Sequence, residues 1–253
     1  MAVSPESLRG LHERAARALP AELVEDAGGW WLRHARGGAW WVRSALPHGG
    51  AAPDELARGI AAAEAFYAGH GVAARFQISP PACADALDAI LAGRGYRRHD
   101  AMSLQGAPTA RVLELVRPGP LRVRLDDRPA DAWFEVWAAA SGHGDDARHE
   151  RDMLARVERP SAYAGAMLGD EVVAVGRAVA DTGWAGLFGM ATLPRARGRG
   201  AARTVLAALA GFARAQGADR MYLQVERRND AALALYGRAG FKEICGYHYR
   251  TAG

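Results

Sequence analysis

Residues 194–200 read PRARGRG, and residues 224–241 read QVERRNDAALALYGRAGF. The first stretch follows a strand-like run at 184–192 and opens a run at 200–215 whose apolar residues have helical spacing. Glycines let a backbone curl tightly, and the first turn of a helix has unpaired N–H groups and a partial positive charge. We therefore expect a cradle for phosphate or pyrophosphate here, surrounded by the cations Arg195, Arg197, Arg199 and Arg203.

Known phosphate-binding patterns do not fit this loop. Gly198-x-Gly200 lacks the third glycine of a dinucleotide fingerprint, because Arg203 stands in its place. No Gly-Lys-Ser/Thr follows, which excludes a P-loop. An RxxGxG loop alone is a weak signal in an arginine-rich chain, so the surrounding sequence has to identify the ligand.

Strand and helix patterns alternate along the rest of the chain. In the first half we expect helices at 4–20, 53–69 and 82–92. We expect strands at 30–34 and 40–46, which form a hairpin that turns at Gly37-Gly38, and further strands at 72–78 and 97–105. Residues 106–120, with three prolines, are the best linker. The second half predicts strands at 121–125, 162–168, 171–180, 184–192 and 219–226, two final strands, and helices at 129–140, 145–158, 200–215 and 229–238.

The two halves resemble each other. Both SALPHGG (44–50) and MATLPRARGRG (190–200) precede an alanine-rich helix and then a strand with Phe-Gln-Ile or Leu-Gln-Val, while LAGRGY (91–96) parallels YGRAGF (236–241). We infer a duplicated fold unit. The first copy lacks RxxGxG, its Pro53 removes an N–H, and Leu91 stands where the second has Tyr236. It is therefore not expected to bind the same ligand, and its expected role is to wall the acceptor site or complete the sheet.

With the RxxGxG loop and the run NxxAxxLYxxxGF at 229–241, residues 120–253 resemble the GCN5-related N-acetyltransferase (GNAT) superfamily, and the whole chain resembles its tandem-domain members. The resemblance implies an α/β (α+β) fold of two tandem units, each a mixed, mostly antiparallel, twisted sheet flanked by helices. Residues 1–110 would form a degenerate unit. Residues 120–253 would form the acetyltransferase unit.

The family implies acetyl-CoA as acyl donor, its pyrophosphate on the amides of the loop and its pantetheine along strand 188–192, where the strand at 220–226 would splay away. Tyr236 matches the general acid that protonates the leaving thiolate, and an N–H near Met190 or Ala191 would stabilise the developing oxyanion. Asn229 would contact the cofactor arm. The implied cofactor-binding set is Met190, Ala191, Thr192, Arg195, Arg197, Gly198, Arg199, Gly200, Ala201, Ala202, Arg203, Asn229 and Tyr236.

The general base is less defined. Strand 184–192 has no glutamate, which several family members carry there, so Glu226 on the next strand is the candidate, acting directly or through water. Its alternative is a surface carboxylate paired with Arg227 or Arg228. Other candidates near the acceptor are His143, His149, Glu150 and His248, or instead the neighbours of His248, since alternate strand residues face opposite ways.

The aromatic residues of the first half leave two roles open. Trp30-Trp31 and Trp40-Trp41 occur as doublets in strand-like runs, so each doublet puts one ring on either face. Such rings pack in a core or between domains. They also form an aromatic acceptor pocket.

Composition bounds the remaining classes. Half of the 253 residues are apolar, but no uncharged apolar run reaches the ~18 residues of a membrane span. The N-terminus has no signal pattern. Together these features favour a cytoplasmic protein with no membrane partner. Cys83 and Cys245 are too few for a disulfide framework, and no metal motif occurs. Of 32 basic residues 31 are arginine, which fits a GC-rich bacterial genome and explains the basic pI of about 9.4 without nucleic acid.

These observations favour one function over two others. The leading hypothesis is an enzyme that transfers an acetyl group from acetyl-CoA to the amine of a small-molecule or amino-acid-like acceptor, by direct attack in a ternary complex. A non-catalytic acyl-CoA-binding or regulatory module is the alternative, suggested by the missing strand carboxylate. Nucleic-acid binding lacks a basic stripe with interleaved aromatics. Tandem units pair internally, so a monomer is favoured, with a homodimer as the other option.

Overall fold

A computed structural model describes residues 4–37, 40–80, 82–141 and 147–253. His143 and Gly38, part of the predicted turn, lie outside these residues. None of the helices in the described ranges is long and apolar enough to cross a membrane. The helices are α1 (Pro5–Ala18), η1 (Trp40–Val42), α2 (Pro53–Gly69), α3 (Leu87–Gly93), α4 (Thr109–Leu115), α5 (Asp131–Ser141), α6 (Ala147–Ala155), η3 (Pro194–Ala196), α7 (Ala201–Ala215) and α8 (Asp230–Arg238).

The strands form two sheets. A small sheet has the order β1 (Leu23–Asp26), β2 (Trp30–His34), β3 (Leu46–Pro47). A large sheet has the order β4 (Arg75–Ile78), β11 (Lys242–Thr251), β5 (Arg97–Pro108), β10 (Arg220–Glu226), β9 (Trp184–Thr192), β8 (Glu171–Asp181), β7 (Ser161–Leu168), β6 (Arg122–Asp126). Within it only β9 and β10 are parallel, so the predicted mixed, mostly antiparallel α/β architecture is confirmed.

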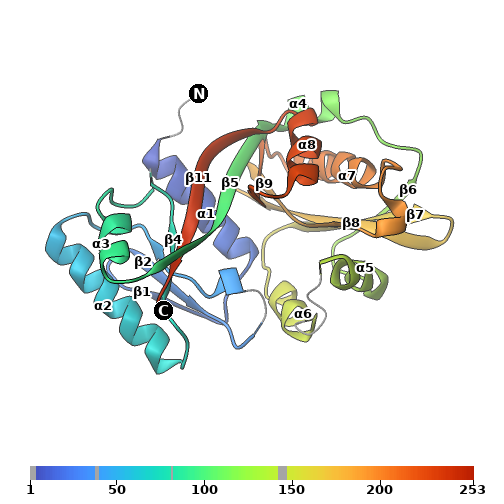
Figure 1. The fold of residues 1–253 in the computed structure, drawn as a ribbon. Coiled ribbons are helices and arrows are strands. Elements are labelled where there is room, and N and C mark those ends of the chain that lie inside the picture. Colours follow the sequence, from blue (N-terminus) through green and yellow to red (C-terminus); the bar gives the residue numbers. More distant parts are fainter. Residues whose placement is uncertain (1–3, 38–39, 81, 142–146) are drawn as a thin grey trace.

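The last strands of the two halves are exchanged. β5, from the first half, pairs with β10 of the second, while β11, from the second half, pairs with β4 of the first. β5 and β11 also pair with each other, and Figure 1 shows them side by side through the middle of the molecule. The chain therefore builds one continuous sheet across both halves.

Three segments differ from the sequence expectation. Residues 40–46 form η1 and only a short β3, because the buried Arg33 guanidinium donates hydrogen bonds to the carbonyls of Trp41 and Ser44 and draws this segment into a turn. The expected linker contains α4, whose Val112 is fully buried against α7. The two predicted final strands are one strand, β11, which absorbs its irregularities as register shifts against β5.

Helices cover both faces of the second-half sheet (Figure 1). α7 packs on one face, where a Cβ built at Gly176 would meet Val205 and Leu209. α5 lies on the opposite face, where the Trp133 indole N–H donates to the carbonyl oxygen of Gly176. The C-terminal end of α1 reaches this second face as well, since Arg177 of β8 donates to the carbonyl oxygen of Ala18. The two faces of these strands therefore have different surroundings: α7 packs on one face, and α5 and the end of α1 pack on the other.

Candidate active site

The loop before α7 has the shape of an anion cradle. Gly198 and Gly200 have φ of 75° and 80°, a left-handed conformation that favours glycine, and Gly200 is the N-cap of α7. A Cβ built at Gly198 would have no heavy atom within 4 Å, so this side of the loop is open. The first turn of α7, with Ala201 and Ala202, contains no acidic residue. Its N–H groups therefore keep their partial positive charge.

The predicted arginines surround this loop on the surface. Arg195, Arg197, Arg199 and Arg203 are all exposed. Arg195 pairs with Glu171 of β8. The other three make no ion pair with a described residue, which leaves their guanidinium groups available to an anion.

Next to this cradle, β9 and β10 separate. They pair only from Arg220–Leu223 to Trp184–Leu187. Beyond that point β9 stays paired with β8 through Thr192, and β10 stays paired with β5 through Glu226. A register shift in the β8–β9 ladder accompanies Gly189, whose φ is 60°. Met190, Ala191 and Thr192, the residues predicted to bind the pantetheine arm, follow at once and are half-buried.

Tyr236 of α8 lies on the α7 side of the sheet. It is 7% exposed within the core cluster of that face, with its ring edge-on to Phe241 at 5.8 Å between centroids. Burial raises the pKa of Tyr236 to about 12, since ionisation would leave a charge in an apolar surrounding. The phenol therefore keeps its proton at neutral pH, as a general acid must.

The other two motif residues have local partners. Glu226, at the end of β10, accepts a hydrogen bond from Arg228 Nε at 2.6 Å and remains partly exposed. Asn229 caps α8, its Oδ1 accepting from the Ala232 N–H at 3.1 Å. Its amide NH₂ has no hydrogen bond to a described residue. Glu226 thus has the partner that its surface-pair interpretation requires, and Asn229 serves first as a helix cap.

The histidine candidates are not brought together. His149 is exposed and its ring packs against Gly37, while Glu150 is buried. His248 lies beside Asp88, with 2.8 Å between Nε2 and Oδ1, away from the splayed strands. Its neighbours face the other way: Tyr247 contacts the His12 ring, and Tyr249 contacts Trp40.

Aromatic residues that the sequence analysis did not single out border the splay. A Cβ at Gly189 would lie 3.4 Å from the rings of Trp133 and Trp137 of α5. Phe188, the preceding residue, packs against Tyr222 at 6.1 Å between centroids. The spacing Trp133-x-x-x-Trp137, which puts both rings on one helix face, was an available signal for this wall.

The matching loop before α2 in the first half is not a comparable cradle. The Glu55 carboxylate accepts a hydrogen bond from the Ala52 N–H at 3.0 Å and so occupies the N-terminus of α2. A Cβ at Gly50 would lie 2.2 Å from this carboxylate, so the space is filled. Leu91, at the position of Tyr236, is fully buried. At these two matching positions the first half therefore has neither an open helix N-terminus nor a hydroxyl.

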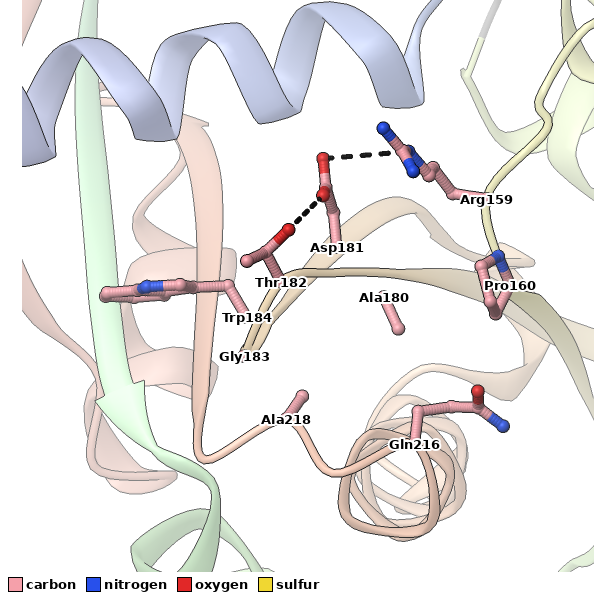
Figure 2. A pocket seen from close by; sticks show the side chains of 9 residues that line it. All are labelled: Arg159, Pro160, Ala180, Asp181, Thr182, Gly183, Trp184, Gln216 and Ala218. Atoms are coloured by element: carbon pink, nitrogen blue, oxygen red, sulfur yellow. Dashed lines mark hydrogen bonds and ion pairs between the residues drawn. The ribbon is translucent and has the colours of Figure 1, made fainter.

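A separate cavity of about 210 Å³ lies at the opposite end of α7. It is bounded by Gln216, the C-cap of α7, and by the β8–β9 turn with Asp181 and Trp184 (Figure 2). Asp181 accepts hydrogen bonds from Thr182 and from Arg17 of α1. Its charge is therefore satisfied within the protein, and α7, 15 residues or about 22 Å long, separates the cavity from the glycine loop.

Among the described residues, no group of three or more His, Cys, Asp or Glu side chains is placed so that it could hold a metal ion.

Known proteins resemble this chain in sequence. Residues 126–241 match the family model described as Acetyltransferase (GNAT) family. The uncharacterized N-acetyltransferase YobR of Bacillus subtilis is 26% identical over 253 residues, covering 97% of this chain and 98% of that protein. The family-model match at 126–241 includes the glycine loop, the splayed strands and Tyr236.

Solved structures share the whole architecture. A GCN5-related N-acetyltransferase from Kribbella flavida superposes with a TM-score of 0.75 at 17% identity, covering 100% of this chain and 97% of that one. A tandem GNAT protein from the clavulanic acid biosynthesis pathway, solved without AcCoA, gives 0.66 at 14% identity, covering 92% and 84%. These likenesses concern the fold.

The split parallel strand pair and the cationic helix end both lie within residues 126–241, the segment that matches the acetyltransferase (GNAT) family. This segment is therefore a GNAT acetyltransferase domain.

Proposed function

We propose that the protein transfers an acetyl group from acetyl-CoA to the amine of a small-molecule or amino-acid-like acceptor, by direct attack in a ternary complex. The observation that carries this proposal is the separation of β9 from β10 directly beside the uncapped, cationic N-terminus of α7. Bound acetyl-CoA would supply the activated thioester.

The residues present fit acetyl-CoA. The amides of Gly198, Gly200 and the first turn of α7 would bind the pyrophosphate, with Arg197, Arg199 and Arg203 beside it. The open side of Gly198 leaves room for a phosphate to approach the backbone. Unpaired edges of Met190, Ala191 and Thr192 would bind the pantetheine amides by backbone hydrogen bonds.

Residues of this chain would supply the proton transfers. The acceptor nitrogen forms a bond to the carbonyl carbon and loses its proton to the Glu226 carboxylate, directly or through water. A backbone N–H near Met190 or Ala191 holds the carbonyl oxygen while it carries charge. The Tyr236 hydroxyl would give its proton to the thiolate sulfur that leaves when the thioester is cleaved. Proton exchange with solvent restores both side chains.

We further propose that residues 120–253 are the transferase unit and residues 1–110 a degenerate copy. Glu55 at the N-terminus of α2 and Leu91 at the position of Tyr236 support this division of roles. The first unit would contribute β5 to the sheet and Trp41 to the acceptor side.

The test is acetyl-CoA binding by calorimetry together with release of free thiol in the presence of an amine panel. Arg197→Ala and Arg199→Ala should each weaken acetyl-CoA binding about tenfold, because each removes a charge-assisted phosphate contact. Arg214→Ala, at the exposed C-terminal end of the same helix, is the matched control and should leave the affinity unchanged. Binding without thiol release on any amine would instead favour the non-catalytic module.

A further inference from the structure

The acceptor side of the splay has a composition of its own. On the α7 side lie Tyr236 and the apolar cluster around Leu223 and Val225. On the opposite side β9 presents Phe188, and α5 places Trp137 against Gly189. Because the α7 side is filled by core and by the proposed general acid, an acceptor has to approach from the α5 side.

A residue of the first half closes this side. Trp41 of η1 packs against two apolar clusters, one around Trp133 and Phe134 of α5 and one around Tyr222 and Tyr247 of the central sheet. Its ring therefore lies between α5 and the sheet. Trp41, Trp137 and Phe188 are each only half-buried, whereas Trp133, Phe134 and Tyr222 behind them are buried. Each of the three rings therefore keeps some exposed surface, and Trp137 lies directly against Gly189, where the strands separate.

The charges on this side do not suit a polycation. Arg177, 2% exposed, holds its guanidinium 4.8 Å above the Phe188 ring. Its Nη1 has no hydrogen-bond partner in the described structure, and its surroundings are Glu150 of α6, Tyr163 of β7 and Tyr222 of β10. Glu150 is itself buried, and Glu226 is paired with Arg228. Additional ammonium groups of an acceptor would therefore meet a fixed cation, and of the two described carboxylates named here one is buried and the other is paired.

We propose that this aromatic wall, made of Trp41, Trp137 and Phe188, selects a monoamine that carries an aromatic ring. The inference rests on the proposed function, since it names the acceptor of the same site. Aromatic side chains recognise a planar ring by edge-on and offset-stacked contacts, beyond the area that they bury. A ring seated between Trp41 and Trp137 would hold its aminoalkyl arm toward the unpaired edge of β9 at Met190.

The experiment compares amines at one acetyl-CoA concentration. We expect kcat/KM for 2-phenylethylamine to exceed that for 2-cyclohexylethylamine about fivefold, as aromatic pairing predicts, and that for spermidine about a hundredfold. Equal values for the aromatic and saturated amines, or a preference for spermidine, would overturn the inference. Acetyl-CoA binding is measured in parallel, so that loss of all turnover and all binding is recognised as failure of the proposed function.

Variants of the wall separate recognition from folding. Trp137→Leu and Trp41→Leu should each raise KM for 2-phenylethylamine about tenfold and leave acetyl-CoA affinity unchanged, while Trp137→Phe should recover most of the loss. Trp184→Leu is the matched control, because Trp184 is half-buried on the same strand but at its far end, where Arg220 lies over its ring. If Trp137→Phe behaves as Trp137→Leu, or if Trp184→Leu has the same effect, the wall does not select the acceptor.

Discussion

At the scale of single residues, Tyr236 is the side chain whose chemistry can be tested most directly. Its hydroxyl is buried, and burial raises its pKa to about 12, so replacement by phenylalanine removes one proton donor and little volume. We predict that Tyr236→Phe lowers kcat about a hundredfold, as expected for loss of a general acid, and changes acetyl-CoA affinity less than threefold. Steady-state kinetics and calorimetry measure the two effects. An unchanged kcat would remove Tyr236 from the mechanism.

His12 of α1 has a structural role that depends on its charge. It is 2% exposed, with Nε2 3.0 Å from Ser79 Oγ and Nδ1 2.7 Å from Gln77 Nε2. Burial, helped by His48 and Arg33, lowers the pKa of His12 to about 3. His48 is in turn paired with Glu13, and the Tyr247 ring lies against His12. The folded protein therefore keeps this imidazole neutral.

The neutral imidazole makes stability depend on pH. Between its unfolded pKa of 6.5 and its folded value of about 3, the unfolded chain binds one more proton, so stability rises with pH and is lost as pH falls below 6.5. We predict that acidification from about pH 7.5 to about pH 5 costs the wild type about 2 kcal/mol more than it costs His12→Gln. Urea unfolding of both proteins at both pH values measures the difference. Equal losses would mean that His12 does not titrate on unfolding.

The sequence singled out the motif residues, but it did not show which distant aromatic residues lie beside them. The glycine loop and Tyr236 were found because their chemistry depends on neighbours within a few residues of the chain. Trp41 and Phe188 border the same site from segments almost 150 residues apart, and only the folded sheet brings them there. A local sequence pattern does not predict that these two distant segments lie side by side.

At the scale of elements, the N-termini of α2 and α7 show how one residue changes a helix end. Glu55 is the third residue of α2 and caps it, while the third residue of α7 is Arg203. A carboxylate at this position stabilises a helix, and it also repels a phosphate. In the first half a side chain of the protein therefore caps the N-terminus of α2, whereas no side chain caps the N-terminus of α7 in the second half.

An exchange of these residues should have opposite effects on stability and on binding. We predict that Arg203→Glu stabilises the protein by about 0.3–1 kcal/mol, through the helix dipole and a new cap, and weakens acetyl-CoA binding more than tenfold. Glu55→Arg should destabilise the protein by about 1 kcal/mol without changing that affinity. Thermal unfolding and calorimetry of the two variants provide the comparison. Loss of affinity in both would contradict the assignment of binding to the second half.

Elements were mispredicted where a distant contact overrides a local preference. Trp40–Leu46 has the composition of a strand, yet the hydrogen bonds donated by Arg33 hold its carbonyls in a turn. The proline-containing segment expected to be a linker holds the end of β5 and then α4, because Thr109 Oγ1 donates to the Ala218 carbonyl oxygen and Val112 is buried beneath α7. Both contacts join residues that the sequence pattern treats as unrelated.

At the scale of the whole molecule, the exchange of β5 and β11 ties the halves together. The family resemblance implied a sheet for each half, while the first half was also expected to wall the acceptor site or complete the sheet of the second. The pattern of a strand does not identify its partner, and β5 and β11 have the same position in the two copies. The backbone of β5 forms ladders with β10 and β11 over nearly its full length. Neither half then keeps its sheet without a strand of the other.

The exchange predicts that cutting the connection leaves the protein in one piece. A specific protease site introduced at Arg117-Pro118, between α4 and β6, lies outside the strand ladders, although the neighbouring Gly119 N–H donates to Thr204 Oγ1 of α7. After cleavage we expect the fragments to co-elute in size-exclusion chromatography and to unfold in a single transition, because the ladders of β5 with β10 and of β4 with β11 cross the cut. The midpoint should fall with protein dilution, since folding has become bimolecular. Fragments that separate without denaturant would show that each half completes its own sheet, and the interleaved topology would be wrong.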